Sequence, residues 1–303
     1  NNCLYTYKYF RNNSDAQSEQ GTGTQMPAYL RPTELGEALE ALAAGGHTIV
    51  AGGTDFYPAR VGRTIDEDVL DVTAIDGLRR IEDRGDHFYI GAGATWTDLI
   101  RADLPDWFRA LKQAAREVGG VQIQNAGTVV GNICNASPAA DGMPGLVALD
   151  ATVVLGSVSG ERVIAITDFV QGNRKTARKP DEMVLGLRIP ACGTDASSAF
   201  LKLGARKYLV ISIVMVSAVL EKAADGTVDR LRIAVGSCSE VARRLPALEA
   251  ALAGKPVDAS LAGLITADHL APLSPIGDVR GSADYRIDAA LTLVRRAVTE
   301  LTE

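Results

Sequence analysis

Cysteine and histidine are scarce in this sequence. The 303 residues include four cysteines, which lie far apart in the chain: Cys3, Cys134, Cys192 and Cys238. No two of them form a C-x-x-C pair, and none stands near a histidine at metal-ligand spacing. We therefore expect no iron–sulfur cluster or other metal site in this chain, and such sparse thiols favour a reduced, cytoplasmic location.

Membrane-spanning segments and massed positive charge are missing as well. The longest apolar run, Leu209 to Leu220, contains two serines and is shorter than the roughly 20 residues that cross a bilayer. Lysine and arginine are scattered, and the formal net charge is −6. Neither a nucleic-acid-binding stripe nor a basic membrane patch is predicted, so the expected partners are proteins and small molecules.

The composition is that of a globular protein. With 47% hydrophobic and 22% charged residues, a chain of 303 residues is long enough for about two domains. Residues 1–25 are rich in Asn, Ser, Gln and Gly, and they lack the basic and apolar segments of a secretory signal. We expect a leader or added extension without fixed structure, or a natural arm that packs on a partner.

One stretch, Gln124 to Asp141, stands out from the rest. Gly127 and Gly131 bracket β-branched residues and are followed by Asn132, a spacing typical of a tight loop that runs into a helix. Glycine permits positive φ and leaves no Cβ to block a ligand. Backbone N–H groups that converge beside a helix N-terminus bind phosphate oxygens without a lysine or arginine.

A second glycine loop lies upstream, where the apolar strand end Ile49 to Ala51 meets Gly52 and Gly53. Two phosphate-binding loops in one chain favour a diphosphate ligand. Each loop alone is more often an ordinary tight turn, because glycine is the usual turn residue. The presence of both loops in one chain is the stronger indication of a diphosphate ligand.

Strands and helices alternate through the first part of the chain. A helix is predicted after Pro32, capped by Thr33 and stopped at Gly45. Further strands are expected at 48–51, 68–72, 87–92, 151–158, 161–166 and 182–189, and further helices at 96–104, 106–118 and 137–149.

The pattern changes at about Gly193, which is the best candidate for a domain boundary. Beyond it, strands at 199–207, 211–222 and 227–235 precede helices at 240–253, near Leu261 and at 289–301. Strands followed by helices predict a small α+β domain. The expected division is therefore 26–192 and 193–303.

Several motifs occur in an order that resembles one known family. They are A-G-G-T-D-F at 51–56, N-A-G-T-V-V-G-N at 125–132, S-P-A-A-D at 137–141, and G-S-A-D-Y-R at 281–286 with V-R-R-A at 294–297. From about Met26 to the C-terminus the chain resembles the FAD-binding medium subunit of molybdenum hydroxylases, the family of xanthine, carbon monoxide and nicotinate or nicotine dehydrogenases. The resemblance implies an α+β fold, with a two-lobed FAD-binding domain of the vanillyl-alcohol-oxidase (PCMH) type followed by a small α+β domain.

The resemblance also assigns roles to residues. It places the FAD diphosphate between the two glycine loops, with the hydroxyls of Thr54 and Thr128 as further donors. It implies Asp141 as a partner for a ribose or other polar group, Leu185 as a wall near the adenine, and Lys202 as a residue that reaches the flavin from the second domain. The implied cofactor-binding set is Ile49, Val50, Ala51, Gly52, Gly53, Thr54, Asp55, Phe56, Thr128, Val129, Val130, Gly131, Asn132, Asp141, Leu185 and Lys202, with no catalytic or metal-binding residue.

Two residues depart from the family's pattern. Val130 stands where a glycine is common, which implies a less close approach of the backbone to the phosphate. Thr54 stands where some related flavoenzymes carry a histidine that bonds covalently to FAD, so non-covalent FAD is expected. His47, just before the first strand, is expected to be structural.

The family's division of labour implies the function. Hydroxylation occurs at a molybdopterin cofactor in a large partner subunit, and electrons pass through [2Fe-2S] clusters in a small one. This chain would then transfer them through FAD to a terminal acceptor, within a heterotrimer or its dimer. The run G-A-R-K-Y-L-V-I-S at 204–212 most resembles subunits of the family's bacterial purine and N-heterocycle branch, which implies a purine or other N-heterocycle as the substrate.

Two alternatives stay open. A stand-alone FAD-dependent reductase or oxidase needs its own substrate pocket with titratable groups, and the sequence holds only three histidines: His47, His87 and His269. A non-enzymatic scaffold would use the glycine loops as plain turns. Bound flavin in the purified protein would exclude the scaffold.

Overall fold

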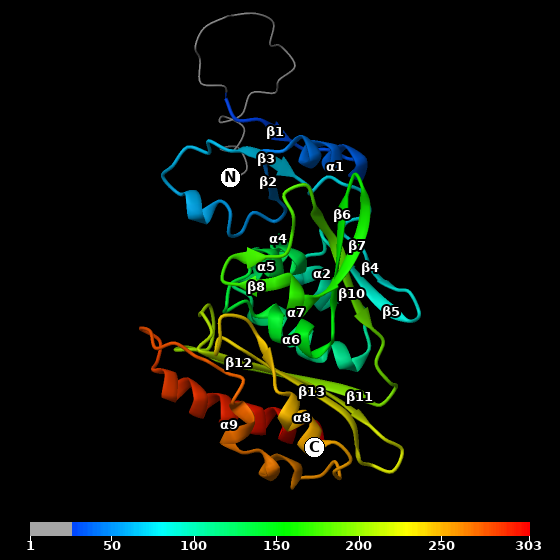
Figure 1. Cartoon of the computed structure of the whole chain (residues 1–303), viewed down its shortest axis with the longest axis vertical. Helices are drawn as coiled ribbons and strands as arrows, with labels where there is room; N and C mark the ends of the chain where they lie inside the picture. The colour runs from blue at the N-terminus through cyan, green and yellow to red at the C-terminus, as the bar shows by residue number, and fades with distance from the viewer. Residues whose placement is uncertain (1–25) are drawn as a thin grey trace, which may run out of the picture.

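The computed structural model describes residues 26–303. The sequence prediction for residues 1–25 lies outside these described residues. At one end of the molecule, a short parallel sheet of order β1-β3-β2 is covered by helix α1 (Figure 1). These elements are β1 (Tyr29–Leu30), α1 (Leu35–Ala44), β2 (His47–Val50) and β3 (Asp68–Asp71), with the 3-10 turn η2 (Pro58–Arg60) between the last two.

The second lobe is built on an antiparallel sheet of order β4-β5-β10-β6-β7. Its strands are β4 (Ile81–Asp83), β5 (His87–Gly91), β6 (Thr152–Ser157), β7 (Gly160–Ala165) and β10 (Met183–Pro190). Its helical elements are α2 (Trp96–Arg101), η3 (Asp106–Phe108), α3 (Arg109–Glu117), α4 (Val121–Ala126), α5 (Val129–Asn135), α6 (Gly142–Ala148) and α7 (Ile166–Phe169). A small hairpin follows, β8 (Val170–Gly172) and β9 (Lys175–Thr176).

The C-terminal part is an antiparallel sheet of order β11-β12-β13-β14 with helices after it. Its strands are β11 (Ala196–Leu203), β12 (Val214–Lys222), β13 (Val228–Gly236) and β14 (Arg243–Arg244), and its helical elements are α8 (Pro246–Leu252), η4 (Leu261–Leu264), η5 (Ala267–Leu270) and α9 (Ala283–Thr302). The expected α+β fold, with a two-lobed first part, is confirmed. The predicted boundary residue Gly193 falls in the connection between β10 and β11.

Strand β12 explains why the longest apolar run of the sequence is not a membrane segment. Side chains alternate between the two faces of a strand. Val214, Val216 and Ala218 pack in the core that includes α9, whereas Val219 packs in the core of the first part and Met215 in a small cluster with residues of α3. The sheet is therefore covered on both faces, by α9 on one side and by α3 and α6 on the other (Figure 1). No helix within residues 26–303 is long and apolar enough to cross a membrane.

Three expectations about helix starts need correction. The segment 129–132 is not an open loop, because helix α5 begins at Val129. Helix α6 begins at Gly142 rather than at Ser137, since residues 137–141 form turns in which the Ala140 N–H donates to the Ser137 carbonyl. Helix α1 has Glu34 at its N-cap, with no side-chain capping bond, instead of Thr33.

Asp150 joins the two parts of the chain electrostatically. It follows α6 with a left-handed φ of 51°, and its carboxylate accepts hydrogen bonds from three arginines of the C-terminal sheet. These are Arg230 at 2.7 Å, Arg232 at 3.3 Å and Arg244 at 2.6 Å. The Arg232 side chain is only 2% exposed and also pairs with Glu221 at 2.7 Å. One carboxylate thus compensates several cations at this junction.

We predict that Asp150→Asn lowers the free energy of unfolding by about 1–3 kcal/mol, because it weakens charged hydrogen bonds to a buried guanidinium. Chemical denaturation measures the effect. Asp229→Asn is the matched control, since Asp229 is an exposed carboxylate on β13 with no hydrogen bond to the part of the chain described here. Equal losses in both variants would contradict the assigned role of Asp150.

Candidate cofactor site

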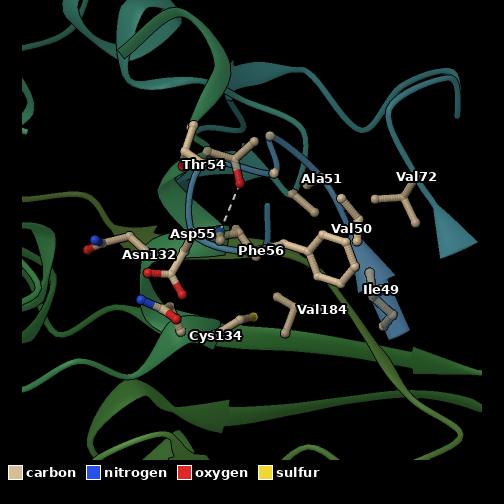
Figure 2. Close-up of a pocket in the computed structure, with 18 of the residues that line it drawn as sticks. Ile49, Val50, Ala51, Thr54, Asp55, Phe56, Val72, Asn132, Cys134 and Val184 are labelled. Atoms are coloured by element: carbon tan, nitrogen blue, oxygen red, sulfur yellow. Dashed lines mark hydrogen bonds between the residues drawn. The ribbon is translucent and has the colours of Figure 1, made fainter. Parts of the chain in front are cut away.

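A cleft at the glycine segments has a volume of about 550 Å³ and lies between the first lobe and the helices of the second. This volume is within the ordinary range for small-molecule and cofactor sites. Figure 2 shows the apolar side chains of Ile49, Val50 and Val72 toward one end of the cleft and Asp55 and Asn132 toward the other. The cleft therefore offers an apolar wall and a polar end to one elongated ligand.

The first glycine segment is pressed against the second. A Cβ on Gly52 would lie 1.9 Å from the carbonyl oxygen of Ala126, so only glycine permits this approach of two backbones. Gly53 has a φ of +66°, and a Cβ there would lie 2.5 Å from the Tyr57 ring. The glycines are thus required first for contact between the segments and for the turn itself, a reason that the sequence did not reveal.

The turn leaves four successive backbone N–H groups, Gly53 to Phe56, without an acceptor among residues 26–303. All four residues line the cleft. The Oγ of Thr54 also lies close to Gly127. A Cβ built on Gly127 would be 3.2 Å from this oxygen. Unpaired amides that line one concave turn carry partial positive charge and bind anions.

The second segment adds donors from the first turn of α5. Thr128 caps the helix, and its hydroxyl accepts a hydrogen bond from the Gly131 N–H at 2.9 Å. The hydroxyl proton of Thr128 stays available for donation. The N–H of Val129 donates to Ala94 at 3.0 Å, whereas that of Val130 has no acceptor in the described part of the chain. Val130, the departure from the family's pattern, is buried in the core at 4% exposure.

Charged residues at the cleft form specific pairs. Asp55 pairs with Arg174 of the β8–β9 turn at 2.7 Å, and both side chains are more than half exposed. Arg60 stacks over the Phe56 ring at 3.7 Å, donates to the Phe56 carbonyl at 2.9 Å and pairs with Glu67. The loop of residues 53–56 is thus held by Arg174 through Asp55 and by Arg60 through Phe56.

The structure brings most of the sequence-predicted residues together. Of the predicted set, the cleft is lined by residues 49–56 and by Thr128, Val130, Gly131 and Asn132. Val129, Asp141, Leu185 and Lys202 do not line it. Sequence reasoning missed several other lining residues, some beside the glycine segments and some far from them: His47, Arg60, Val72, Trp96, Cys134, Asn135, Arg178, Met183 and Val184.

Asp141 and Lys202 instead meet each other. Lys202 Nζ lies 2.9 Å from Asp141 Oδ2, and the Ser212 hydroxyl donates to Asp141 Oδ1 at 2.7 Å. The side chains of Asp141 and Lys202 are only 13% and 6% exposed. Burial raises the pKa of the Asp141 carboxyl, and the charge of Lys202 and the hydrogen bond from Ser212 oppose that rise. The pair links the first part of the chain to the C-terminal sheet.

Leu185 of β10 does not line the cleft. Its neighbours Met183 and Val184 line the cleft, the pairing of β10 with β6 shifts register between Val184 and Gly186, and the Leu185 side chain packs against Gly156. The Leu185 carbonyl accepts a hydrogen bond from the Tyr89 hydroxyl at 2.9 Å.

Comparisons with known proteins agree with this geometry. A family described as the FAD binding domain in molybdopterin dehydrogenase matches residues 22–192, and one described as the CO dehydrogenase flavoprotein C-terminal domain matches residues 199–301. The chain belongs to this family. It is an FAD-binding medium subunit of the molybdenum hydroxylase type, and its two matched domains account for nearly the whole described chain.

Individual relatives cover most of the chain. The beta subunit of caffeine dehydrogenase from Pseudomonas sp. (strain CBB1) is 31% identical over 91% of this chain and 94% of its own length. The nicotinate dehydrogenase FAD-subunit of Eubacterium barkeri is 38% identical over 55% of this chain and 58% of its own length. A structure of carbon monoxide dehydrogenase from Hydrogenophaga pseudoflava contains a chain that is 30% identical, with a TM-score of 0.79 over 90% of this chain and 96% of that one.

We predict that Gly52→Ala lowers the free energy of unfolding of this flavin subunit by about 1–3 kcal/mol, because the added methyl group collides with the Ala126 carbonyl. Thermal or chemical unfolding measures the loss. Gly36→Ala is the control, since a Cβ there meets nothing within 4 Å, and it should leave stability unchanged or slightly raised. A neutral Gly52→Ala variant would contradict the close contact between the two segments.

We predict that Asp141→Asn and Lys202→Met each destabilise the subunit by about 3–5 kcal/mol, because each leaves a buried partner charge uncompensated. The double variant should lose less unfolding free energy than the sum of the two single losses, since no buried charge is then left without a partner. A double-mutant cycle from chemical denaturation measures this coupling. Strictly additive losses would contradict the pairing.

Proposed function

We propose that this chain carries non-covalent FAD as the electron-transfer subunit of a heteromeric molybdenum hydroxylase. It receives electrons from iron–sulfur clusters of a partner subunit and transfers them through FAD to a terminal acceptor. The observation that supports this proposal most strongly is that the residues with unpaired N–H groups, Gly53–Phe56, line one cleft together with the start of α5. That arrangement suits a diphosphate, the feature that FAD has and simpler flavins lack.

The proposed roles of the residues follow from their positions. Residues 53–56 hold the diphosphate together with Thr128, Val130, Gly131 and Asn132, and Ile49, Val50 and Val184 form an apolar wall beside it. Thr54 offers a hydroxyl and no ring nitrogen, so the cofactor is held without a covalent bond. FAD, when bound, supplies the electron-transfer chemistry, and the protein supplies binding, orientation and exclusion of water.

The Asp141–Lys202 pair has a proposed role at the junction of the two parts. We propose that residues 26–192 form the FAD-binding domain and residues 193–303 the C-terminal domain. Asp141 and Ser212 fix the position of Lys202 at this junction, and because neither Asp141 nor Lys202 lines the cleft, their roles toward the cofactor stay predictions. The role of Leu185 near the adenine stays a prediction.

The proposed substrate of the whole complex is a purine or other N-heterocycle. Two relatives are named for caffeine, a purine, and for nicotinate, a pyridine. The hydroxylation site belongs to a large partner subunit with molybdopterin, and the [2Fe-2S] clusters to a small one. We propose a heterotrimer of these subunits or its dimer, located in the cytoplasm.

No cleft residue pair favours the stand-alone reductase or oxidase. The titratable groups that line the cleft include His47, Asp55, Arg60 and Arg178. Asp55 pairs with Arg174, and Arg60 pairs with Glu67. His47 Nδ1 lies 3.1 Å from the Gly45 carbonyl oxygen. The residues of the cleft thus bind and position, as an electron-transfer subunit requires.

We predict that purification of this chain from its native cells brings down one larger and one smaller protein together with molybdenum, iron and FAD. An absorption spectrum, metal analysis and mass spectrometry of the purified material measure the outcome. Recovery of the chain alone, with FAD and with activity toward a small donor, would instead establish the stand-alone flavoenzyme.

A further inference from the structure

Arg178 is a cation of the cleft that the family motifs do not include. It lies in the connection between β9 and β10, and it lines the cleft together with Asn132, Cys134 and Asn135. Its Nη1 donates to three backbone carbonyls, those of Lys179 at 3.0 Å, Pro180 at 3.3 Å and Glu182 at 2.7 Å. These bonds fix the guanidinium through a single nitrogen.

The other nitrogens of Arg178 stay free. Within residues 26–303, neither Nε nor Nη2 donates a hydrogen bond, and no carboxylate pairs with this side chain. Two other arginines near the cleft are neutralised, Arg60 by Glu67 and Arg174 by Asp55. Arg178 therefore contributes a positive charge and unused N–H donors, an arrangement suited to an anion.

The segment that carries Arg178 is built to hold it still. Glu182, which is 4% exposed, binds Arg162 through two parallel bonds of 2.6 and 2.8 Å. The same carboxylate accepts the Lys179 N–H at 2.8 Å, and Arg162 also donates to the Ala177 carbonyl at 2.8 Å. The turn on both sides of Arg178 is thus held by one ion pair, of which Glu182 is buried and Arg162 partly exposed, before any ligand binds.

We propose that Arg178 binds the diphosphate of the cofactor, as a side-chain donor that complements the backbone N–H groups of residues 53–56. The inference rests on the proposed FAD function. A guanidinium presents parallel N–H donors to phosphate oxygens and keeps its charge at any physiological pH. Because its position is fixed in advance, little conformational entropy is lost when the diphosphate binds.

The test compares Arg178→Gln with wild type and with Lys179→Gln as purified flavin-bearing protein. Lys179 is the adjacent residue, is exposed and does not line the cleft, so its variant removes the same charge from the same turn. Release of FAD on dilution is followed by flavin fluorescence at several NaCl concentrations. We expect Arg178→Gln to bind FAD about 10–100-fold more weakly, with a shallower salt dependence, and Lys179→Gln to resemble wild type.

A competition experiment tests whether Arg178 contacts the diphosphate of the cofactor. Riboflavin has no phosphate, so it should displace FAD about 10–100-fold more readily from Arg178→Gln than from wild type. ADP carries the same diphosphate and should compete equally in both proteins. Arg178→Lys keeps the charge but loses the planar fork, so an intermediate loss is expected, and this variant replaces Arg178→Gln if the latter does not fold.

Unchanged FAD release from Arg178→Gln, or unchanged competition by riboflavin, would overturn the assignment of Arg178 and leave the proposed function intact. Wild-type protein that carries no FAD would instead contradict the proposed function, and this inference with it. Equal losses in Arg178→Gln and Lys179→Gln would show a general effect of charge and would also overturn the specific contact.

Discussion

The site depends on the contact of two backbones, that of Gly52 and that of Ala126 and Gly127. A side chain on Gly52 would reach to 1.9 Å of the Ala126 carbonyl oxygen, so the two segments meet only because one of them is glycine. The second segment is fixed in turn by backbone bonds from Trp96 to Gly127 at 3.1 Å and from Val129 to Ala94 at 3.0 Å. The N–H groups of the turn at 53–56 have no acceptor among residues 26–303, and all four residues line the cleft.

The rest of the structure keeps these two glycine segments in position. The five-stranded sheet supplies β10, whose start forms one wall of the cleft, and the C-terminal sheet packs on α3 and α6 through a strand that is apolar on both faces. Buried charges then join the two parts of the chain at Asp150 and at the Asp141–Lys202 pair. Such pairs add little net stability but penalise wrong placement of one part on the other, because a misplaced charge would stay buried without a partner.

Glycine spacing and apolar periodicity predicted most of the strands and pointed to the two glycine loops. The two-lobed α+β fold and the residue set 49–56 and 128–132 were implied by the family resemblance, and the cleft is lined by all of this set except Val129. These predictions failed where the outcome depends on tertiary contacts. The start of α5 at Val129 follows from the hydrogen bond of Val129 to Ala94, and the pairing of Asp141 with Lys202 joins residues 61 apart in the sequence. The sequence did not indicate a role for Arg178, because a single arginine in a turn is common. Its role is suggested only by its place in the cleft together with the absence of a carboxylate partner in residues 26–303.

The central claim is that these two segments cradle one non-covalent FAD per chain. The flavin-to-protein ratio of the purified wild-type chain, measured before and after acid precipitation, tests it most directly. The account predicts one FAD per chain, all of it released into the supernatant by acid. Protein that carries no flavin would contradict the cradle, and flavin that stays with the precipitated chain would contradict the non-covalent binding inferred from Thr54.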